Sequence, residues 1–133
     1  MKIVVLKFGG TSVGSIDRIK NVAKIIISYI KKRFKVVVIS SAMSEETNKL
    51  IQLTKELSKN FTPSEYDSLL ATGEQVSCSL IAGRLNDQGY LARSWQSWQI
   101  PIITTGKHSH SRIVNINKKN IIKFLRKGGI PII

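Results

Sequence analysis

A short segment near the start of this sequence carries the residue types that phosphate chemistry needs. It reads Lys7-Phe8-Gly9-Gly10-Thr11-Ser12 and follows an apolar run. Two adjacent glycines let backbone N–H groups approach a phosphate without a Cβ in the way, while the Lys7 ammonium and two hydroxyls add donors. The spacing matches neither the Walker A pattern nor Gly-x-Gly-x-x-Gly. Taken alone, Gly-Gly after a strand is more often an ordinary tight turn.

Two further polar segments occur later in the chain. One follows an apolar run and reads Ser40-Ser41-Ala42-Met43-Ser44-Glu45-Glu46-Thr47-Asn48, and the other reads Thr72-Gly73-Glu74-Gln75. On residue type alone, Thr47 is a loop hydroxyl and Glu74 is a solvated or capping carboxylate at a helix start. Each segment by itself is weak evidence for a site.

The hydrophobic pattern predicts the elements that must position these segments. Ile3–Leu6 and Val36–Ile39 are short β-rich apolar runs, which we expect to be buried strands. Between them, Ser15 can cap a helix in which apolar side chains recur with a 3.6-residue period through Ile30. Strand, glycine turn, helix and strand make a βαβ unit, and such units imply an α/β fold with a parallel sheet.

The remainder of the chain is predicted to continue this pattern. Helices are expected at Lys49–Lys59, from Thr62 to Gly89 with an interruption at Gly73, and at Asn117–Lys127. Strands are expected near Tyr90–Trp95 and at Ile130–Ile133. An irregular stretch follows the first of these strands and runs through Arg112. A buried parallel strand normally needs a following helix or loop, whereas this sequence stops inside its last strand. We therefore expect a fragment; the alternative is an edge strand tucked under the first helix.

Composition narrows the class of protein. The chain has 133 residues, 42% of them hydrophobic, which is enough for one domain and argues against disorder. It contains no apolar run of about 18 residues and no signal-peptide pattern, so we expect no membrane association. The single Cys78 forms no disulfide framework, suits the cytoplasm and is expected to be a core thiol.

The net charge of +13 raises the question of an anionic partner. A basic module that binds nucleic acid is one hypothesis, but the cations are mostly Lys and are dispersed along the chain, which argues against it. His108 and His110 have no Cys or carboxylate beside them, so we interpret them as loop residues and expect no metal site. Trp95 and Trp98 are expected to pack rather than to stack on a base.

The three polar segments together resemble the aspartokinases, a family within the amino-acid kinase superfamily. The family opens with Lys-Phe-Gly-Gly-Thr-Ser-Val, as in Lys7–Val13 here, and the resemblance runs collinearly from Met1 to Ile133. The later matching motifs are Ser41-Ala42-Met43, Thr47-Asn48, Gly73-Glu74, Trp98-Gln99, and Thr104, His108, Arg112 and Ile113.

The resemblance implies an α/β fold of three layers, αβα, around a mostly parallel sheet. It implies that residues 1–133 are the N-terminal, substrate-side part of a kinase domain, without an ACT regulatory domain. The implied activity is ATP-dependent phosphorylation of the side-chain carboxylate of L-aspartate, which opens lysine, threonine and methionine biosynthesis. The co-substrate would be ATP with Mg²⁺. The implied ATP-binding residues are Lys7, Phe8, Gly9 and Gly10, with Lys7 also catalytic, and the implied substrate-binding residues are Ser41, Thr47 and Glu74.

This sequence departs from the family at several positions. Glu45 stands where the family commonly has Gly, Ser97 replaces the Gly before Trp98-Gln99, and Thr105 stands where an Asp usually follows the Thr. The second half of the family's kinase domain, which carries further nucleotide-binding motifs, has no counterpart here. Two readings follow from this resemblance. In one, the chain is a split subunit that a complementing C-terminal chain or a homo-oligomer would complete, and in the other it is an inactive remnant. A third reading is a relative acting on another carboxylate, a carbamate or a nucleotide, against which Thr47-Asn48 and Gly73-Glu74 argue.

Overall fold

Four parallel strands form the frame of the molecule. The structure is a computed structural model that describes residues 2–133. The strands lie in the spatial order β1 (Ile3–Phe8), β2 (Lys35–Ser40), β6 (Ile130–Ile132) and β3 (Ala92–Ser94), and every neighbouring pair is parallel. This confirms the parallel sheet that the βαβ pattern predicts. Helices are needed to cover such a sheet, because parallel strands are normally buried on both faces.

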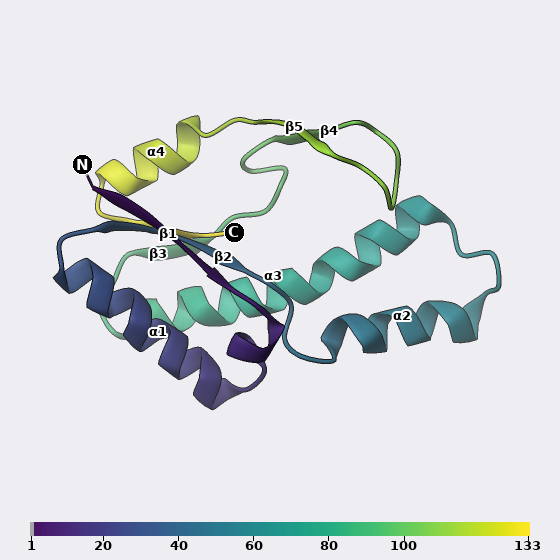
Figure 1. Ribbon diagram of the computed structural model, residues 1–133, viewed down its shortest axis with the longest axis horizontal. Helices are drawn as coiled ribbons and strands as arrows, with labels where there is room; N and C mark the ends of the chain where they lie inside the picture. The colour runs from purple at the N-terminus through teal and green to yellow at the C-terminus, as the bar shows by residue number, and fades with distance from the viewer. Residues whose placement is uncertain (1) are drawn as a thin grey trace.

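Helices lie on both faces of the sheet (Figure 1). On one face, α1 (Ile16–Lys31) and α3 (Pro63–Asp87) pack against the strands around a core that includes Ile26, Val38 and Ile81. On the other face, α4 (Lys119–Arg126) packs through Ile121 and Leu125 around a second, smaller core. The three-layer αβα arrangement is therefore confirmed. Among residues 2–133, no helix combines the length and the apolar character needed to cross a membrane.

The first helix is connected to β1 as the sequence predicts. After β1 the chain makes a short 3₁₀ helix, η1 (Gly10–Val13), and then enters α1. The Ser15 hydroxyl accepts a hydrogen bond from the backbone N–H of Arg18 at 3.3 Å, which confirms its capping role.

Gly73 does not interrupt its helix, contrary to the sequence prediction. α3 runs unbroken through it, so Gly73-Glu74 lies in the middle of a helix and not at its start. The physical reason is packing: a Cβ at Gly73 would lie 2.9 Å from the Cβ of Ala42, so glycine permits a close approach. The first half of α3 projects beyond the sheet beside α2 (Glu46–Leu57), as Figure 1 shows.

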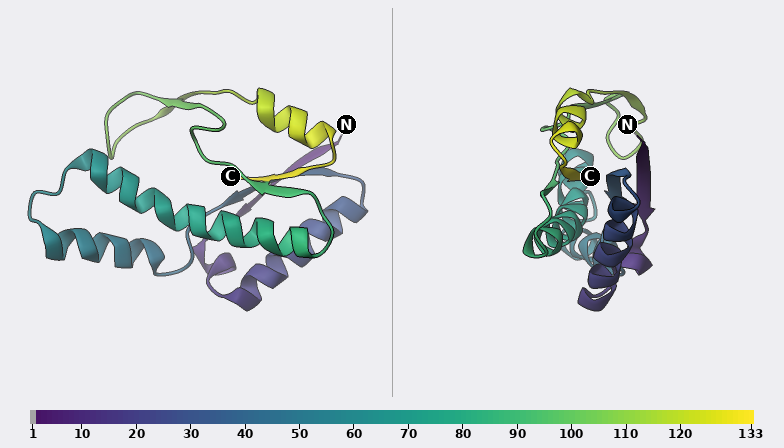
Figure 2. Two further views of the ribbon diagram at one scale, coloured as in Figure 1. Left: turned by 180° about the vertical axis from the view of Figure 1, so that it is seen from behind. Right: turned by 90° about the vertical axis from the view of Figure 1, so that its left-hand side faces the viewer.

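The stretch before α4 contains an antiparallel hairpin that the sequence did not indicate. Strands β4 (Ile102–Thr104) and β5 (Ile113–Ile116) pair with a register irregularity at Ile103/Thr104. They are short and lack a two-residue turn signal, which is why the pattern looked irregular. The hairpin arches from α4 to the beginning of α3 (Figure 2). Beside it Trp98 is 67% exposed, so the expectation that it packs was wrong, whereas Trp95 is buried.

The two strands at the chain ends occupy positions that the sequence could not assign. β6 lies between β2 and β3 and is buried throughout, so the edge-strand alternative for it was wrong. β1 and β3 are the edge strands, and Val5 of β1 is 61% exposed, which corrects the expectation that β1 is buried. The reason is that α4 packs mainly on β6, so the side chain of Val5 on β1 stays exposed.

Candidate active site

The loops that follow β1 and β2 meet at one edge of the sheet. Phe8 and Ser40, the last residues of the two strands, are register partners, so the loops begin side by side. The backbone N–H of Ser41 donates to the Phe8 carbonyl at 3.0 Å. In an open α/β sheet, this carboxyl edge is where ligands bind. The polar segments after the two strands are therefore brought together.

Glycines allow these two loops to approach each other closely. A Cβ on Gly10 would lie 3.1 Å from the Ala42 carbonyl oxygen, and a Cβ on Gly14 would lie 2.8 Å from the Ser44 hydroxyl. No atom comes within 4 Å of the corresponding point at Gly9, which is exposed. Gly10 thus serves packing between the loops, whereas Gly9 leaves backbone open to a ligand.

The middle of α3 supplies the third polar segment. The Glu74 carboxylate accepts a hydrogen bond from the backbone N–H of Ala42 at 3.3 Å through Oε1. One turn later, the Ser77 hydroxyl donates to the Ser41 carbonyl at 2.7 Å. Glu74 is half-buried and its second oxygen, Oε2, has no partner among the hydrogen bonds of the described residues. The carboxylate is therefore held at the loop with one oxygen left for a ligand.

The remaining predicted residues are placed as follows. Thr47 is half-buried in the first turn of α2, where free backbone N–H groups favour an anion. Phe8 has a buried side chain in the main core, so only its backbone can take part in a site. Lys7 is exposed on the same face of β1 as Val5, and none of the four ion pairs in the described part of the chain includes it. Among residues 2–133, no ion pair joins Lys7 to Glu74.

Glu45 has an unusual backbone at the start of α2. Its φ is 66° and ψ is −11°, the left-handed region, where a side chain is disfavoured. Glycine adopts this backbone conformation without the cost that a Cβ adds. The Glu45 carboxylate accepts a hydrogen bond from Asn48 Nδ2 at 3.1 Å and is exposed.

Burial makes the neighbouring thiol unreactive. Cys78 is 3% exposed, and its burial raises the pKa of the thiol to about 11. At neutral pH it stays protonated, so it cannot act as a nucleophile or a metal ligand. The prediction that it is a core thiol is confirmed.

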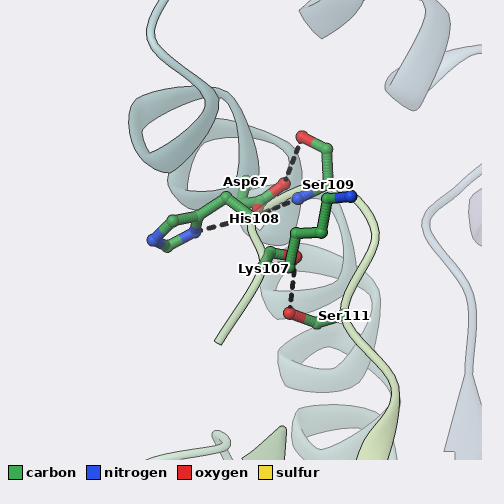
Figure 3. A network of polar contacts seen from close by, with 5 residues as sticks. All are labelled: Asp67, Lys107, His108, Ser109 and Ser111. Carbon is green, nitrogen blue, oxygen red and sulfur yellow. Dashed lines mark hydrogen bonds and ion pairs between the residues drawn. The ribbon is translucent and has the colours of Figure 1, made fainter. Parts of the chain in front are cut away.

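The two histidines lie in the loop between β4 and β5. His108 Nδ1 lies 3.0 Å from Asp67 Oδ2, and Ser109 donates to Asp67 through its backbone N–H at 2.9 Å (Figure 3). The pKa of Asp67 is lowered, chiefly by that backbone hydrogen bond. Within residues 2–133, no three His, Cys, Asp or Glu side chains are grouped to hold a metal ion. The loop contact instead attaches the hairpin to α3.

The model of the amino acid kinase family matches residues 2–133 of this chain. The chain belongs to the amino acid kinase family. It is 46% identical over its whole length to the aspartokinase of Geobacillus stearothermophilus and covers 33% of that protein. This chain therefore spans about a third of the length of the curated relatives it matches.

Solved structures of amino acid kinases have the same fold. Aspartate kinase from Synechocystis superposes with a TM-score of 0.82 at 35% identity, over 99% of this chain and 21% of that one. E. coli aspartokinase III, in complex with aspartate and ADP, gives a TM-score of 0.83 over 99% of this chain and 40% of that one. At 18% identity, the second comparison bears on the fold alone.

Two features of this kinase-family site were missed from the sequence. One is Ser77, whose only sequence signal is its position one helical turn after Glu74 on the same face. The other is the packing role of Gly73, since the sequence showed a helix breaker where the fold needs a close contact. Both depend on how α3 crosses the β2 loop, which no local pattern encodes.

Proposed function

We propose that residues 1–133 are the N-terminal, substrate-side part of an aspartate kinase. The reaction is transfer of the γ-phosphoryl group of ATP to the side-chain carboxylate of L-aspartate, which gives 4-phospho-L-aspartate and ADP, the first step towards lysine, threonine and methionine. The observation that carries the proposal is the contact of Glu74 with the Ser41-Ala42 loop beside the glycine turn after β1. Family membership and 46% identity to an aspartokinase support it.

The chemistry requires positioning rather than a strong base. The aspartate carboxylate is already ionised near neutral pH, so it attacks the γ-phosphorus as it is while the bond to the β–γ bridging oxygen breaks. The protein must hold two anions in line and neutralise the charge on the transferred group. Lys7, which is free of ion pairs in the described residues, is proposed for this role, with backbone N–H groups at Phe8, Gly9 and Gly10. Mg²⁺ would arrive with the ATP phosphates, since its ligands are oxygens and water.

The substrate side recognises the amino acid by charge. The unpartnered oxygen of Glu74 is proposed to accept from the α-ammonium group of aspartate. Thr47 and the N–H groups of the first turn of α2 are proposed to hold a carboxylate. Ser41, in the loop that Glu74 contacts, is proposed to contribute a hydroxyl. E. coli aspartokinase III, which has the same fold, has been solved with aspartate and ADP.

The rest of the nucleotide site is proposed to come from outside these residues. The matching aspartokinases are about three times longer than this chain. A complementing C-terminal chain, a continuation of this one or a homo-oligomer would supply the remainder, with no ACT domain within residues 1–133. We propose the cytoplasm as the site of action and no membrane partner. If nothing completes the site, the chain is an inactive remnant.

The test is ADP release with L-aspartate and MgATP. We expect little turnover from the purified chain and measurable turnover when it is mixed with the C-terminal portion of a close aspartokinase. Lys7→Ala should abolish the complemented activity, whereas Lys24→Ala, an exposed cation on α1, should not. Activity absent in both the single and the mixed samples would eliminate a catalytic role, and activity with another acceptor in a substrate panel would reassign the substrate.

A second candidate function rests on the outer surface of α4. A cavity of about 570 Å³ there is lined by Ile122 and five cations, namely Lys118, Lys119, Lys123, Arg126 and Lys127. All eight acidic residues precede position 88, so the sequence around α4 contains no carboxylate side chain that could neutralise these five cations. Such a surface favours a polyanion, but aromatic side chains for base stacking are missing from its lining. Binding of an oligonucleotide that weakens steeply with salt would support this function, and no binding at low salt would exclude it.

A further inference from the structure

Helix α3 holds both sides of a single peptide group. The Ser41 carbonyl and the Ala42 N–H belong to the same peptide unit, in the loop that follows β2. Ser77 donates to the carbonyl at 2.7 Å, and Glu74 Oε1 accepts from the N–H at 3.3 Å. Because carbonyl and N–H point in opposite directions across a planar unit, two contacts from one helix fix its orientation.

The Ser77 hydroxyl is buried, and its hydrogen bonds are to other groups of the protein. Its relative exposure is 0%, so the hydroxyl can only bond to protein groups. The Ser40 hydroxyl lies 3.3 Å from it and 3.1 Å from the Ser41 carbonyl, so Ser40 is a second, weaker donor to that carbonyl. The single proton of Ser77 lies between the Ser41 carbonyl at 2.7 Å and the Glu74 carbonyl at 3.1 Å. The shorter and therefore stronger contact is the one to the loop.

We propose that Ser77 is a positioning residue for the Ser41–Ala42 loop, which holds Glu74 at the substrate side. It keeps the Ser41–Ala42 peptide turned so that its N–H, and not its carbonyl, faces Glu74. In the flipped orientation the Ser41 carbonyl oxygen would point at the Glu74 carboxylate, which repels it and displaces the carboxylate from the ligand. Ser77 thereby sets where Glu74 and Ser41 stand, without touching the substrate. This inference rests on the proposed aspartate kinase function.

Packing contacts on two sides restrict the movement of the Ser41–Ala42 loop. Ala42 is 4% exposed and lies in the space that a Cβ on Gly73 would fill, so it cannot shift towards α3. On its other side, the Ala42 carbonyl approaches Gly10. Packing therefore confines the Ser41–Ala42 peptide. The hydrogen bond from Ser77 to the carbonyl then keeps the N–H, and not the carbonyl, directed towards Glu74.

The experiment compares three variants of the whole chain by NMR. Ser77→Ala removes the hydroxyl, Ile81→Val trims an equally buried side chain of the same helix, and Glu74→Gln keeps an acceptor for Ala42 but removes the charge. The first readout is the Ser41 carbonyl carbon shift and the hydrogen-exchange rate of the Ala42 N–H. The second is the dissociation constant for L-aspartate, titrated with and without the complementing C-terminal portion. Unfolding in urea is measured for each variant.

The proposal makes a distinct prediction for each variant. In Ser77→Ala the Ser41 carbon should move, Ala42 exchange should accelerate about tenfold, and the dissociation constant should rise about fivefold or more, since one hydrogen bond is lost. Ile81→Val should lower the free energy of unfolding but leave both readouts as in the parent chain. Glu74→Gln should preserve the Ala42 readout and lose aspartate binding.

Two results would overturn the proposal. One is a Ser77→Ala chain in which the Ser41 carbon and the Ala42 N–H are unchanged, and the other is a chain in which they change but the affinity for aspartate does not. A third result separates the positioning role of Ser77 from the proposed aspartate kinase function. If the parent chain binds no aspartate in either sample, but Ser77→Ala still changes the Ser41 carbon shift and the Ala42 exchange rate, the assigned substrate is wrong and Ser77 does hold the peptide.

Discussion

Two glycines in the interior of α3 should respond to alanine with opposite signs. Both Gly73 and Gly83 lie within the helix, where alanine is intrinsically favoured over glycine by about 1 kcal/mol. At Gly83 no heavy atom lies within 4 Å of the new Cβ, so the gain should be nearly complete. We expect Gly83→Ala to raise the free energy of unfolding by about 0.5 to 1 kcal/mol.

At Gly73 the same methyl group meets the β2 loop. The new Cβ would lie 2.9 Å from the Cβ of Ala42, whereas apolar carbons rest about 3.5 to 4.0 Å apart. Either the helix or the loop must move by about an ångström, and overpacking of this kind costs about 1 to 3 kcal/mol. After the helix-propensity gain of about 1 kcal/mol is subtracted, Gly73→Ala should lower the free energy of unfolding by about 1 kcal/mol, the middle of a range of about 0 to 2 kcal/mol.

The assay is urea unfolding followed by circular dichroism at 25 °C. For a domain of this size, a change of 1 kcal/mol moves the midpoint by about 0.3 to 1 M if the slope m is unchanged. The reasoning is refuted if Gly73→Ala is as stable as the parent chain or more stable, because α3 would then not pack tightly on Ala42. Gly83→Ala controls for helix propensity, since it carries the same substitution in the same helix.

Three further outcomes can be measured on the same protein. Cys78, with a thiol pKa of about 11, should resist a thiol reagent at pH 8 in the folded chain and react fully in urea; fast reaction without urea would contradict its burial. The lowered pKa of Asp67 means that its contact with Ser109 stabilises the fold above the ordinary carboxyl range and is lost as pH falls through the folded-state value. Exchange protection of the Ser109 amide, corrected for intrinsic rates, should therefore decline below about pH 4, and Asp67→Asn should remove that pH dependence. Glu45→Gly should be more stable in urea than Glu45→Ala by about 0.5 to 1 kcal/mol, because only glycine relieves the left-handed backbone; equal stability would show that no strain is present there.

The sequence predicted most of the local structure correctly. The helix after Ser15, the strand at Val36–Ile39 and the helix ending before Gly128 depend on periodicity and capping, which are local properties. Predictions failed where a residue's effect depended on a distant neighbour. Gly73 reads as a breaker in isolation, and its use as a contact surface depends on Ala42 in another element.

Some residues of the candidate site could likewise be recognised from the sequence, and others only from the structure. The motif at Lys7–Gly10 and the polar segment after the second strand could be recognised from residue type and order, and Glu74 from the family pattern. Ser77 could not, because a serine inside a helix is unremarkable until its hydroxyl is seen to reach the Ser41 carbonyl. The hairpin was also missed, since its strands are short and it is attached to α3 by the contacts of Asp67.

The sequence by itself determined the fold class, the family resemblance and the residue types available for phosphate and carboxylate binding. These follow from composition, periodicity and motif order, all of which are read along the chain. Only the tertiary structure decided that Glu74 and Ser77 share one peptide group of the β2 loop, that β6 is interior and that β1 is an edge strand. The physical reason is that hydrogen bonding and close packing act across space, between residues more than thirty positions apart.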